Sequence, residues 1–530
     1  MKTLRLGACL GTTLAIVLTA GCTTQQPPVP SNTPMVPANA PHDVNATSRD
    51  RISDGGLLRF GVRSLPAQWN PFHAEAADAD TQRVLAPLAP THFTLDPAGR
   101  ATPNPDFITG ADARHDGNTV VTLQLNANAV WGDGEPLTAA DWVATWEWAR
   151  SGQASPAAVP GWAHVTEVRP GWSPREVVLT YAGIEPDWAE PLVRGPLRAG
   201  SLQAASWTDY TSAHYASPFV VAHVDRPQGL VTLERNPRWW GDAPKLERIM
   251  FRTVQPEAFS AAFLHNELDL WETGLSADAL QQSRAAADTS LRTAPGTRGR
   301  ALAVKPRGPL ADAGVRRALV QGLDRAALLT AALPSETSAA TTAVWSNPLL
   351  LPTQPGYVDQ ARATGLTADP AAAARALDEA GWTLEGGVRT KNGQPLTLTF
   401  EAAEGDVRAS AEFEELLDQW AGLGVTLNAV ASDADLAPRS LPISPFPLAT
   451  LPAEATATAT GRELSDKVSA EVDPVRRADT ASQLARLLWQ EATLVTLYQE
   501  PQYVAVRAGL ANLGAPGYGT TEWEDVGWTS

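Results

Sequence analysis

Cysteine is almost absent from this chain of 530 residues. Only Cys9 and Cys22 are present, and Cys9 falls in an N-terminal apolar stretch that we expect to be removed. The mature chain then has no disulfide and no closed Cys/His metal site. A chain of this length can take its stability from buried apolar cores instead.

Lysine is also scarce. The chain has five lysines, and its 58 acidic residues outnumber the 41 basic ones, which gives a net charge of −17. Nucleic-acid binding needs clustered positive charge, so this composition argues against a nucleic-acid partner. A solvated acidic surface that keeps an exported protein soluble accounts for the charge.

The common catalytic motifs are missing as well. The sequence has no Gly-x-Ser-x-Gly elbow, no His-Glu-x-x-His motif and no Gly-Lys phosphate loop, and its eight histidines never fall at a ligand spacing. Asp133 and Glu135 could be imagined as a glycosidase pair, but they lie in a turn. We therefore expect no enzyme, no metal and no cofactor. Tryptophan, with 18 residues, is abundant and favours a site that binds by apolar stacking.

The N-terminus is typical of a bacterial lipoprotein signal. Lys2 and Arg5 precede an apolar run that ends in Leu-Thr-Ala-Gly-Cys at Cys22, and this run is shorter than the roughly 20 residues of a membrane span. We expect residues 1–21 to be removed as a signal peptide. Acylated Cys22 would then anchor the protein to the outer face of the cell membrane. An ordinary signal peptide or an uncleaved anchor is the alternative.

Beyond the signal, residues 22–51 are rich in Pro, Thr and Ala, and we expect a disordered tether. Strand patterns then alternate with helical patterns, which indicates α/β lobes. The expected strands are 57–62, 120–125, 177–181, 230–234, 246–254 and 302–305. The expected helices are 138–150, 256–266, 314–330, 370–380, 410–423 and 474–492. Residues 433–461 have few apolar anchors, and we expect a loop there.

Six segments follow one another in the order of a known family. The most specific is Trp131–Asp141, with a tryptophan, an Asp-Gly turn, Pro-Leu-Thr and a capped helix start. The other five are Trp69–Pro71, Glu234–Gly241, Asn266–Leu270, Asp312–Arg325 and Ala376–Gly393. Together they resemble the extracytoplasmic solute-binding proteins of the peptide and nickel class (solute-binding protein family 5) of ABC transporters. Most of these residues are explained by structural roles, because they form turns, cap helices or occupy core positions. They therefore identify the fold more than the ligand.

The resemblance implies an α/β, two-lobed periplasmic-binding-protein-like fold of type II, the large peptide-binding class, with a subdomain inserted in the first lobe. It implies lobe I at residues 52–298 with the subdomain at about 91–214, lobe II at 299–497, and a return to lobe I at 498–530. The resemblance also implies a monomer whose lobes close on the solute by hinge bending, here near Leu270 and Leu302. The closed form is then recognised by ABC permease subunits.

The candidate ligand-binding residues follow from their positions in this family. Three lie on the loop after the first strand, three lie near the expected crossing between the lobes, and two could line the second lobe. In that order they are Gln68, Trp69 and Asn70; Trp271, Glu272 and Thr273; and Trp345 and Asn347. An indole at Trp271 could stack on a ligand, and a core position under the hinge is an equally good interpretation.

Two functions remain open. The first is a receptor for a peptide-like or other small amphiphilic solute. The second is suggested by a resemblance to LpqW-like lipoproteins, which act in assembly of cell-envelope mannolipids (lipoarabinomannan) and not in transport. Peptide-binding members of the family carry an aromatic and an acidic residue in the segment matching 433–461. This chain has no tryptophan there and offers only Asp433, Asp435 and Glu454, so we expect ordinary short peptides to bind weakly.

Overall fold

The computed structural model describes residues 41–152, 154, 159–202, 207–334, 341–402 and 405–529. The expected signal peptide, Cys22 and the tether up to residue 40 lie outside these residues. The described residues belong to one compact unit. In this part of the chain no helix is long and apolar enough to cross a membrane. Ordered contacts begin before residue 52, because Asp43 pairs through its backbone with Ala515.

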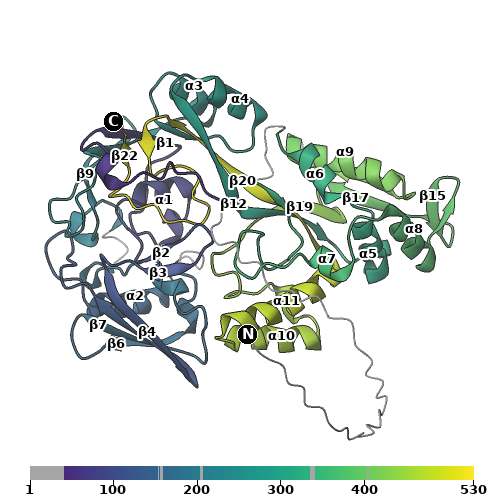
Figure 1. Cartoon of the computed structure of the whole chain (residues 1–530), viewed down its shortest axis with the longest axis horizontal. Coiled ribbons are helices and arrows are strands. Elements are labelled where there is room, and N and C mark those ends of the chain that lie inside the picture. Colours follow the sequence, from purple (N-terminus) through teal and green to yellow (C-terminus); the bar gives the residue numbers. More distant parts are fainter. Residues whose placement is uncertain are drawn as a thin grey trace, which may run out of the picture. The chain divides into compact units, whose positions relative to one another are not determined.

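One β-sheet extends through most of the described chain, and eleven of the described strands form it. Its centre is the antiparallel pair β12 (Thr289–Val304) and β20 (Leu494–Arg507), which carries strands on both flanks (Figure 1). The lobe I flank continues from β20 through β11 (Leu270–Glu272), β1 (Leu57–Val62), β10 (Arg248–Thr253), β9 (Leu230–Arg235) and β8 (Phe219–Asp225). The lobe II flank continues from β12 through β19 (Leu436–Pro442), β17 (Thr397–Glu401) and β18 (Thr426–Val430), while β13 (Ala343–Val344) pairs with β20.

Helices accompany each flank of the sheet. In lobe I they are α1 (Ala79–Leu85), α3 (Phe259–Leu264) and α4 (Ala277–Ala285). In lobe II they are α5 (Ala313–Gln321), α6 (Arg325–Ala332), α7 (Gln360–Thr364), α8 (Pro370–Glu379), α9 (Val407–Ala421), α10 (Ala459–Ala470) and α11 (Pro474–Glu491). Each lobe has its own buried core: the largest cluster of lobe II includes Leu319, Leu398 and Trp420, and that of lobe I includes Phe60, Phe251 and Trp207.

A separate four-stranded sheet lies in the sequence between β1 and β8. Its order is β4 (Ile108–Asp116), β5 (Asn118–Leu125), β7 (Glu176–Tyr181) and β6 (Val165–Pro170), and α2 (Ala139–Ala149) packs on it. Thr138 and Asp141 form a capping box at the start of α2, and Asp141 also accepts a hydrogen bond from the Trp131 indole at 3.2 Å. The segment Trp131–Asp141 is therefore held together by its own hydrogen bonds, which agrees with the structural role that its residue types indicate.

Short strands complete the described structure. They pair as β2 (Phe93–Leu95) with β3 (Ala101–Pro103), as β14 (Thr383–Glu385), β15 (Val388–Lys391) and β16 (Gln394–Pro395), and as β21 (Leu510–Ala511) with β22 (Gly527–Trp528). The last pair brings the C-terminal segment against the core of lobe I, where Trp523 and Val526 are buried.

The pairing of β12 with β20 is interrupted where lobe I passes into lobe II. Pro295 pairs with Pro501, and regular pairing resumes only at Gly299 opposite Gln499. The three residues between them make no pair with β20, and a second register shift follows between Arg300 and Ala301, so this stretch is where the two strands can bend most easily. Gly299 lies against the Trp345 ring, and a Cβ at Gly299 would come within 2.3 Å of it. Position 299 therefore requires glycine for close packing.

Two regions differ from the sequence-based expectation. Residues 433–461 are not one loop, because they contain β19 and the start of α10. The strand was not expected because it contains Pro438 and Pro442. Both prolines are tolerated because β19 pairs along its whole length with β12 but meets β17 only at Leu436. The expected helix 314–330 is split into α5 and α6, because Asp324 accepts hydrogen bonds from the Ala326 and Ala327 amides and starts a new helix.

A buried ion pair joins the central strand β12 to helix α9. The Arg300 guanidinium donates from Nε to both Glu412 carboxylate oxygens, at 2.8 and 3.1 Å, and the Tyr498 hydroxyl donates to Oε1 at 2.7 Å. The side chains of Arg300 and Glu412 are 4% and 0% exposed. Burial and the Glu412 charge both raise the pKa of Tyr498 far above its usual value, which keeps its hydroxyl a donor.

The two lobes also touch away from the central strands. Arg477 on α11 donates from Nη1 and Nη2 to the two oxygens of Asp187, at 2.9 and 2.5 Å, and both side chains are largely buried. Asp187 lies in the segment after β7, and its carbonyl accepts the amide of Glu190. Burial, with the charges of Asp187 and Glu185, raises the pKa of Glu190 to about 7. The negative charges beside this contact therefore favour the protonated form of Glu190.

Glu412→Gln should lower the free energy of unfolding by about 3–5 kcal/mol, because the buried Arg300 charge would lose its counter-ion. The triple variant Arg300→Met, Glu412→Leu, Tyr498→Phe should recover most of that loss, since no buried charge is left. Guanidinium denaturation of purified protein measures both. Equal stability of wild type and Glu412→Gln would contradict the expectation.

Glu190 should make the protein less stable as the pH rises. Its folded pKa of about 7 lies above its unfolded value, so the stabilising contribution is complete below the unfolded pKa and is lost as the pH passes about 7. The loss is at most about 3 kcal/mol, at roughly 1.4 kcal/mol per pKa unit. Urea midpoints at pH 5, 6.5 and 8 should fall more steeply for wild type than for Glu190→Gln. The exposed Glu167→Gln is the matched control, and parallel curves for all three would count against this role of Glu190.

Candidate ligand-binding site

The loop after β1 is shaped by the first three predicted residues. The Gln68 amide oxygen accepts the backbone N–H of Asn70 at 3.1 Å, and the Asn70 amide oxygen accepts that of Phe72 at 3.0 Å. The Trp69 carbonyl accepts the Tyr215 hydroxyl, and all three predicted side chains are buried. They hold Pro71 and Phe72 in place rather than lining a cavity themselves. A direct contact of any of the three with a ligand stays a prediction.

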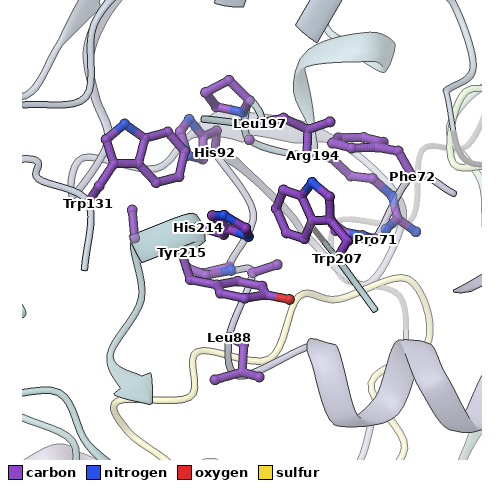
Figure 2. A pocket seen from close by; sticks show the side chains of 15 residues that line it. Pro71, Phe72, Leu88, His92, Trp131, Arg194, Leu197, Trp207, His214 and Tyr215 are labelled. Carbon is purple, nitrogen blue, oxygen red and sulfur yellow. The ribbon is translucent and has the colours of Figure 1, made fainter. Parts of the chain in front are cut away.

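Pro71 and Phe72 line a small pocket that we call the aromatic pocket (Figure 2). Its volume is about 50 Å³. Most of the rings around it come from the segments on either side of the four-stranded sheet. The lining includes Phe72, His92, Trp131, Arg194, Trp207, His214 and Tyr215.

Two histidines of the aromatic pocket have lowered pKa values. Burial lowers the pKa of His92 to about 3, and the ring stacks on Phe107 with centroids 4.0 Å apart. Burial also lowers the pKa of His214. The Nδ1 atoms of both rings are buried without a hydrogen-bond partner among the described residues. The pocket is large enough for a water molecule or a small apolar group, and too small for a whole solute.

A larger pocket lies at the end of β11 and contains the second predicted group. We call it the β11 pocket; its volume is about 530 Å³ and its lining includes Phe60, Arg63, Asp80, Arg83, Phe259, Trp271, Glu272 and Thr273. This volume is within the range of small-molecule sites. Trp271 is nearly buried and lies 6.0 Å from the Phe263 ring. The structure thus brings Trp271, Glu272 and Thr273 together at a cavity, and their contact with ligand stays a prediction.

Charged side chains line one wall of the β11 pocket. Asp80 accepts from Arg63 at 2.6 Å and from Arg83 at 2.9 Å, and Arg83 also pairs with Glu272. Asp80 is almost fully buried, whereas Arg63 and Glu272 are more than half exposed. The pocket combines aromatic rings with exchangeable charges of both signs, which suits a ligand with apolar and polar parts. No sequence motif indicated that Arg63 and Arg83 belong to this site.

The predicted residues of lobe II lie in a core. The Trp345 indole N–H donates to the Leu350 carbonyl at 2.8 Å, and its own carbonyl accepts from Thr496. The Asn347 amide oxygen accepts the N–H groups of Leu349 and Leu350. Both residues are fully buried. They fix the segment after β13, and no cavity described here joins them to the β11 pocket.

The acidic residues near β19 already have basic partners. Asp433 pairs with Lys305 and Arg307, and Asp435 pairs with Arg307 and accepts the Thr399 hydroxyl. The pKa of Asp433 is lowered by its hydrogen bond to Lys305 and by the charge of Arg307. Both carboxylates are therefore already paired with residues of lobe II. Among the described residues, no group of three His, Cys, Asp or Glu side chains could hold a metal ion.

Comparison with known proteins agrees with this two-lobe architecture. The oligopeptide-binding protein OppA of Mycobacterium tuberculosis (strain H37Rv) is 29% identical over 559 aligned positions, covering 97% of this chain and 92% of the relative. The probable monoacyl phosphatidylinositol tetramannoside-binding protein LpqW of the same strain is 22% identical over 463 positions, covering 79% of this chain and 70% of the relative.

Solved structures show the same fold. The periplasmic EDTA-binding protein EppA superposes with a TM-score of 0.76 at 22% identity, covering 92% of this chain and 98% of that one. The Listeria monocytogenes substrate-binding protein CtaP gives 0.74 at 19% identity over 90% of this chain and 100% of that one. The Bacillus subtilis protein AppA, in complex with a nonapeptide, gives 0.65 at 15% identity over 90% and 100%.

The family model of the bacterial extracellular solute-binding proteins, family 5, matches residues 102–449. This span runs from the four-stranded sheet of lobe I, across β12, to β19 in lobe II. The chain therefore belongs to the family 5 bacterial extracellular solute-binding proteins.

Proposed function

We propose that this protein is a lipid-anchored receptor that binds a peptide-like or other small amphiphilic solute and delivers it to the permease of an ABC transporter. The supporting observation is the place of the β11 pocket. Trp271 and Glu272 pair through β11 with Ala505 and Val504 of β20, the strand shared by both lobes. A ligand that changes the position of these residues therefore acts directly on a strand that must bend when the lobes move.

The composition of the pocket indicates the class of solute. Its rings offer apolar contact, and the pairs formed by Arg63, Asp80, Arg83 and Glu272 offer charges of both signs. In the segment of β19, by contrast, Asp433 and Asp435 already have partners. A free peptide ammonium would gain no unpaired carboxylate from these two residues, and an unpaired buried charge costs several kcal/mol. We propose a solute held mainly by ring contact and by the β11 pocket.

A second function is favoured by one specific likeness. The similarity to LpqW, whose name describes binding of a mannosylated phosphatidylinositol, covers 79% of this chain. On this alternative the protein acts in cell-envelope mannolipid assembly without transport. An amphiphilic ligand fits both functions, so the decisive difference is whether bound ligand is passed to a permease.

Trp271→Ala should weaken solute binding at least tenfold, because the indole is the largest ring of the β11 pocket that lies on the shared sheet. The ligand is first identified by mass spectrometry of what co-purifies with the protein, and its affinity is then measured by calorimetry. Trp172→Ala, which alters a 99% exposed indole, is the control and should bind as wild type does. Unchanged affinity in Trp271→Ala would remove the β11 pocket from the proposal.

Cys22→Ala should release the protein from the membrane or leave it as an unprocessed precursor. The attached lipid is the source of membrane affinity in this proposal, at roughly 0.8 kcal/mol per buried CH₂ group. Fractionation of cells, with mass measurement of the released chain, tests it. Thr23→Ala next to the cysteine is the control. A Cys22→Ala protein that is processed and fully membrane-bound would show that the anchor is something else.

A further inference from the structure

A third cavity lies between the C-terminal segment and the body of lobe I. It has two halves of about 310 and 280 Å³, which share five lining residues: Pro90, Thr91, Thr520, Thr521 and Trp523. We call it the C-terminal cavity. It shares no lining residue with the β11 pocket, so neither cavity's ligand depends on the other's residues.

Arg194 lines the first half and has no acidic partner among the described residues. Its one hydrogen bond there is from Nη1 to the neutral Gln82 amide oxygen at 2.8 Å. Burial lowers the pKa of Arg194, and no neighbouring charge offsets the effect. A guanidinium has five N–H donors in a fixed plane and binds carboxylates through two of them at once. This cation therefore lacks the anion that a buried arginine normally has.

Thr91 is a second unsatisfied polar group and lines both halves. Its hydroxyl oxygen is buried and has no hydrogen-bond partner in the described part of the chain. Neighbouring Thr520 is different, because its hydroxyl accepts the Leu95 amide at 2.9 Å. The Thr91 hydroxyl and the Arg194 guanidinium both lack a suitable partner among the described residues. This end of the cavity can therefore hold an oxygen-bearing ligand group.

The second half carries the opposite charge. It is lined by Asp106, Glu522 and Glu524, for which the described residues provide no ion pair, whereas Asp242 and Asp525 are both paired with Arg49. Burial raises the pKa of Glu524 to about 7, and burial and acidic neighbours also raise those of Glu522 and Asp106. These acids do not form a metal-binding group. An organic cation such as an ammonium, placed beside these acids, would stabilise their ionised forms.

We propose that the C-terminal cavity is a second ligand site, which binds a small zwitterion with its carboxylate at Arg194 and Thr91 and its ammonium at Glu522, Glu524 and Asp106. The ligand class is a free amino acid or an ω-amino acid. Charges of opposite sign at the two ends select against molecules that carry only one of them. This site goes beyond the solute site at the β11 pocket and lies wholly within lobe I.

The test uses a series of ω-amino acids with four to eight carbons, together with the singly charged amine and carboxylate of each length. Calorimetry with wild-type protein should show binding by one or two of the zwitterions and at least tenfold weaker binding by the corresponding amines and carboxylates. Arg194→Gln and Glu524→Gln should each reduce the affinity at least tenfold. Trp271→Ala should leave it unchanged, which separates this site from the proposed solute site.

Two results would overturn the proposal. One is the absence of binding by every zwitterion at millimolar concentration. The other is binding that Arg194→Gln and Glu524→Gln leave intact. If a variant fails to fold by circular dichroism, the comparison of zwitterions with singly charged analogues on wild-type protein still decides, because equal binding by a simple carboxylate would reduce the site to an anion site and refute a zwitterion site.

Discussion

The pairing of β12 with β20 is the constraint on which the rest of the structure depends. These two strands carry β11 and β1 on one flank and β19 and β17 on the other, so both lobes are parts of one hydrogen-bonded sheet. The two register shifts in this pair, at Pro295 to Gly299 and at Arg300 to Ala301, are its least regular places. On the lobe II side, the buried pair of Arg300 with Glu412 ties β12 to α9 immediately beyond the interruption. β12 is thereby held to a helix of lobe II directly beside its irregular stretch.

Lobe I contains most of the chemistry. The aromatic pocket, the β11 pocket and the C-terminal cavity are all lined by its residues. Arg194 borders both the aromatic pocket and the C-terminal cavity. Lobe II contributes packed turns around Trp345 and Asn347 and acidic residues that are already paired. The cavities named in the described structure therefore lie in lobe I, although buried polar atoms without a partner also occur in lobe II, on Gln360, Trp420 and Trp489.

Local sequence patterns predicted the fold well where a helix or strand depends on its own residues. The helices α8, α9 and α11 follow their apolar periodicity, and the capping box at Thr138 and Asp141 is readable without a structure. β19 was missed because two prolines argue against a strand, and the pairing that tolerates them is made with residues more than 130 positions away. The split between α5 and α6 is not visible in the apolar periodicity of 314–330, because it depends on the Asp324 side chain capping a new helix.

The site was harder to predict than the fold. Trp271, Glu272 and Thr273 could be placed at a cavity because they end a strand near the expected crossing. Gln68, Trp69 and Asn70 lie on the expected loop, but whether a side chain faces a cavity or its own backbone depends on hydrogen bonds such as that from the Phe72 amide to the Asn70 side chain. Arg194 and Glu524 are 330 residues apart and no motif connects them. Only the folded chain places both around one cavity.

The contact between Arg477 and Asp187 has a consequence for the rate at which a solute exchanges. A largely buried, two-point ion pair between the lobes favours the arrangement in which they touch here even when no solute is bound. A receptor in which many molecules already have this arrangement loses less affinity to conformational rearrangement. The reason is that the apparent dissociation constant equals the intrinsic constant divided by the fraction of competent molecules. If the proposed transport cycle separates the lobes to release solute, the same contact must break first. Tight retention and slow release would then come from one pair of side chains that need not touch the solute.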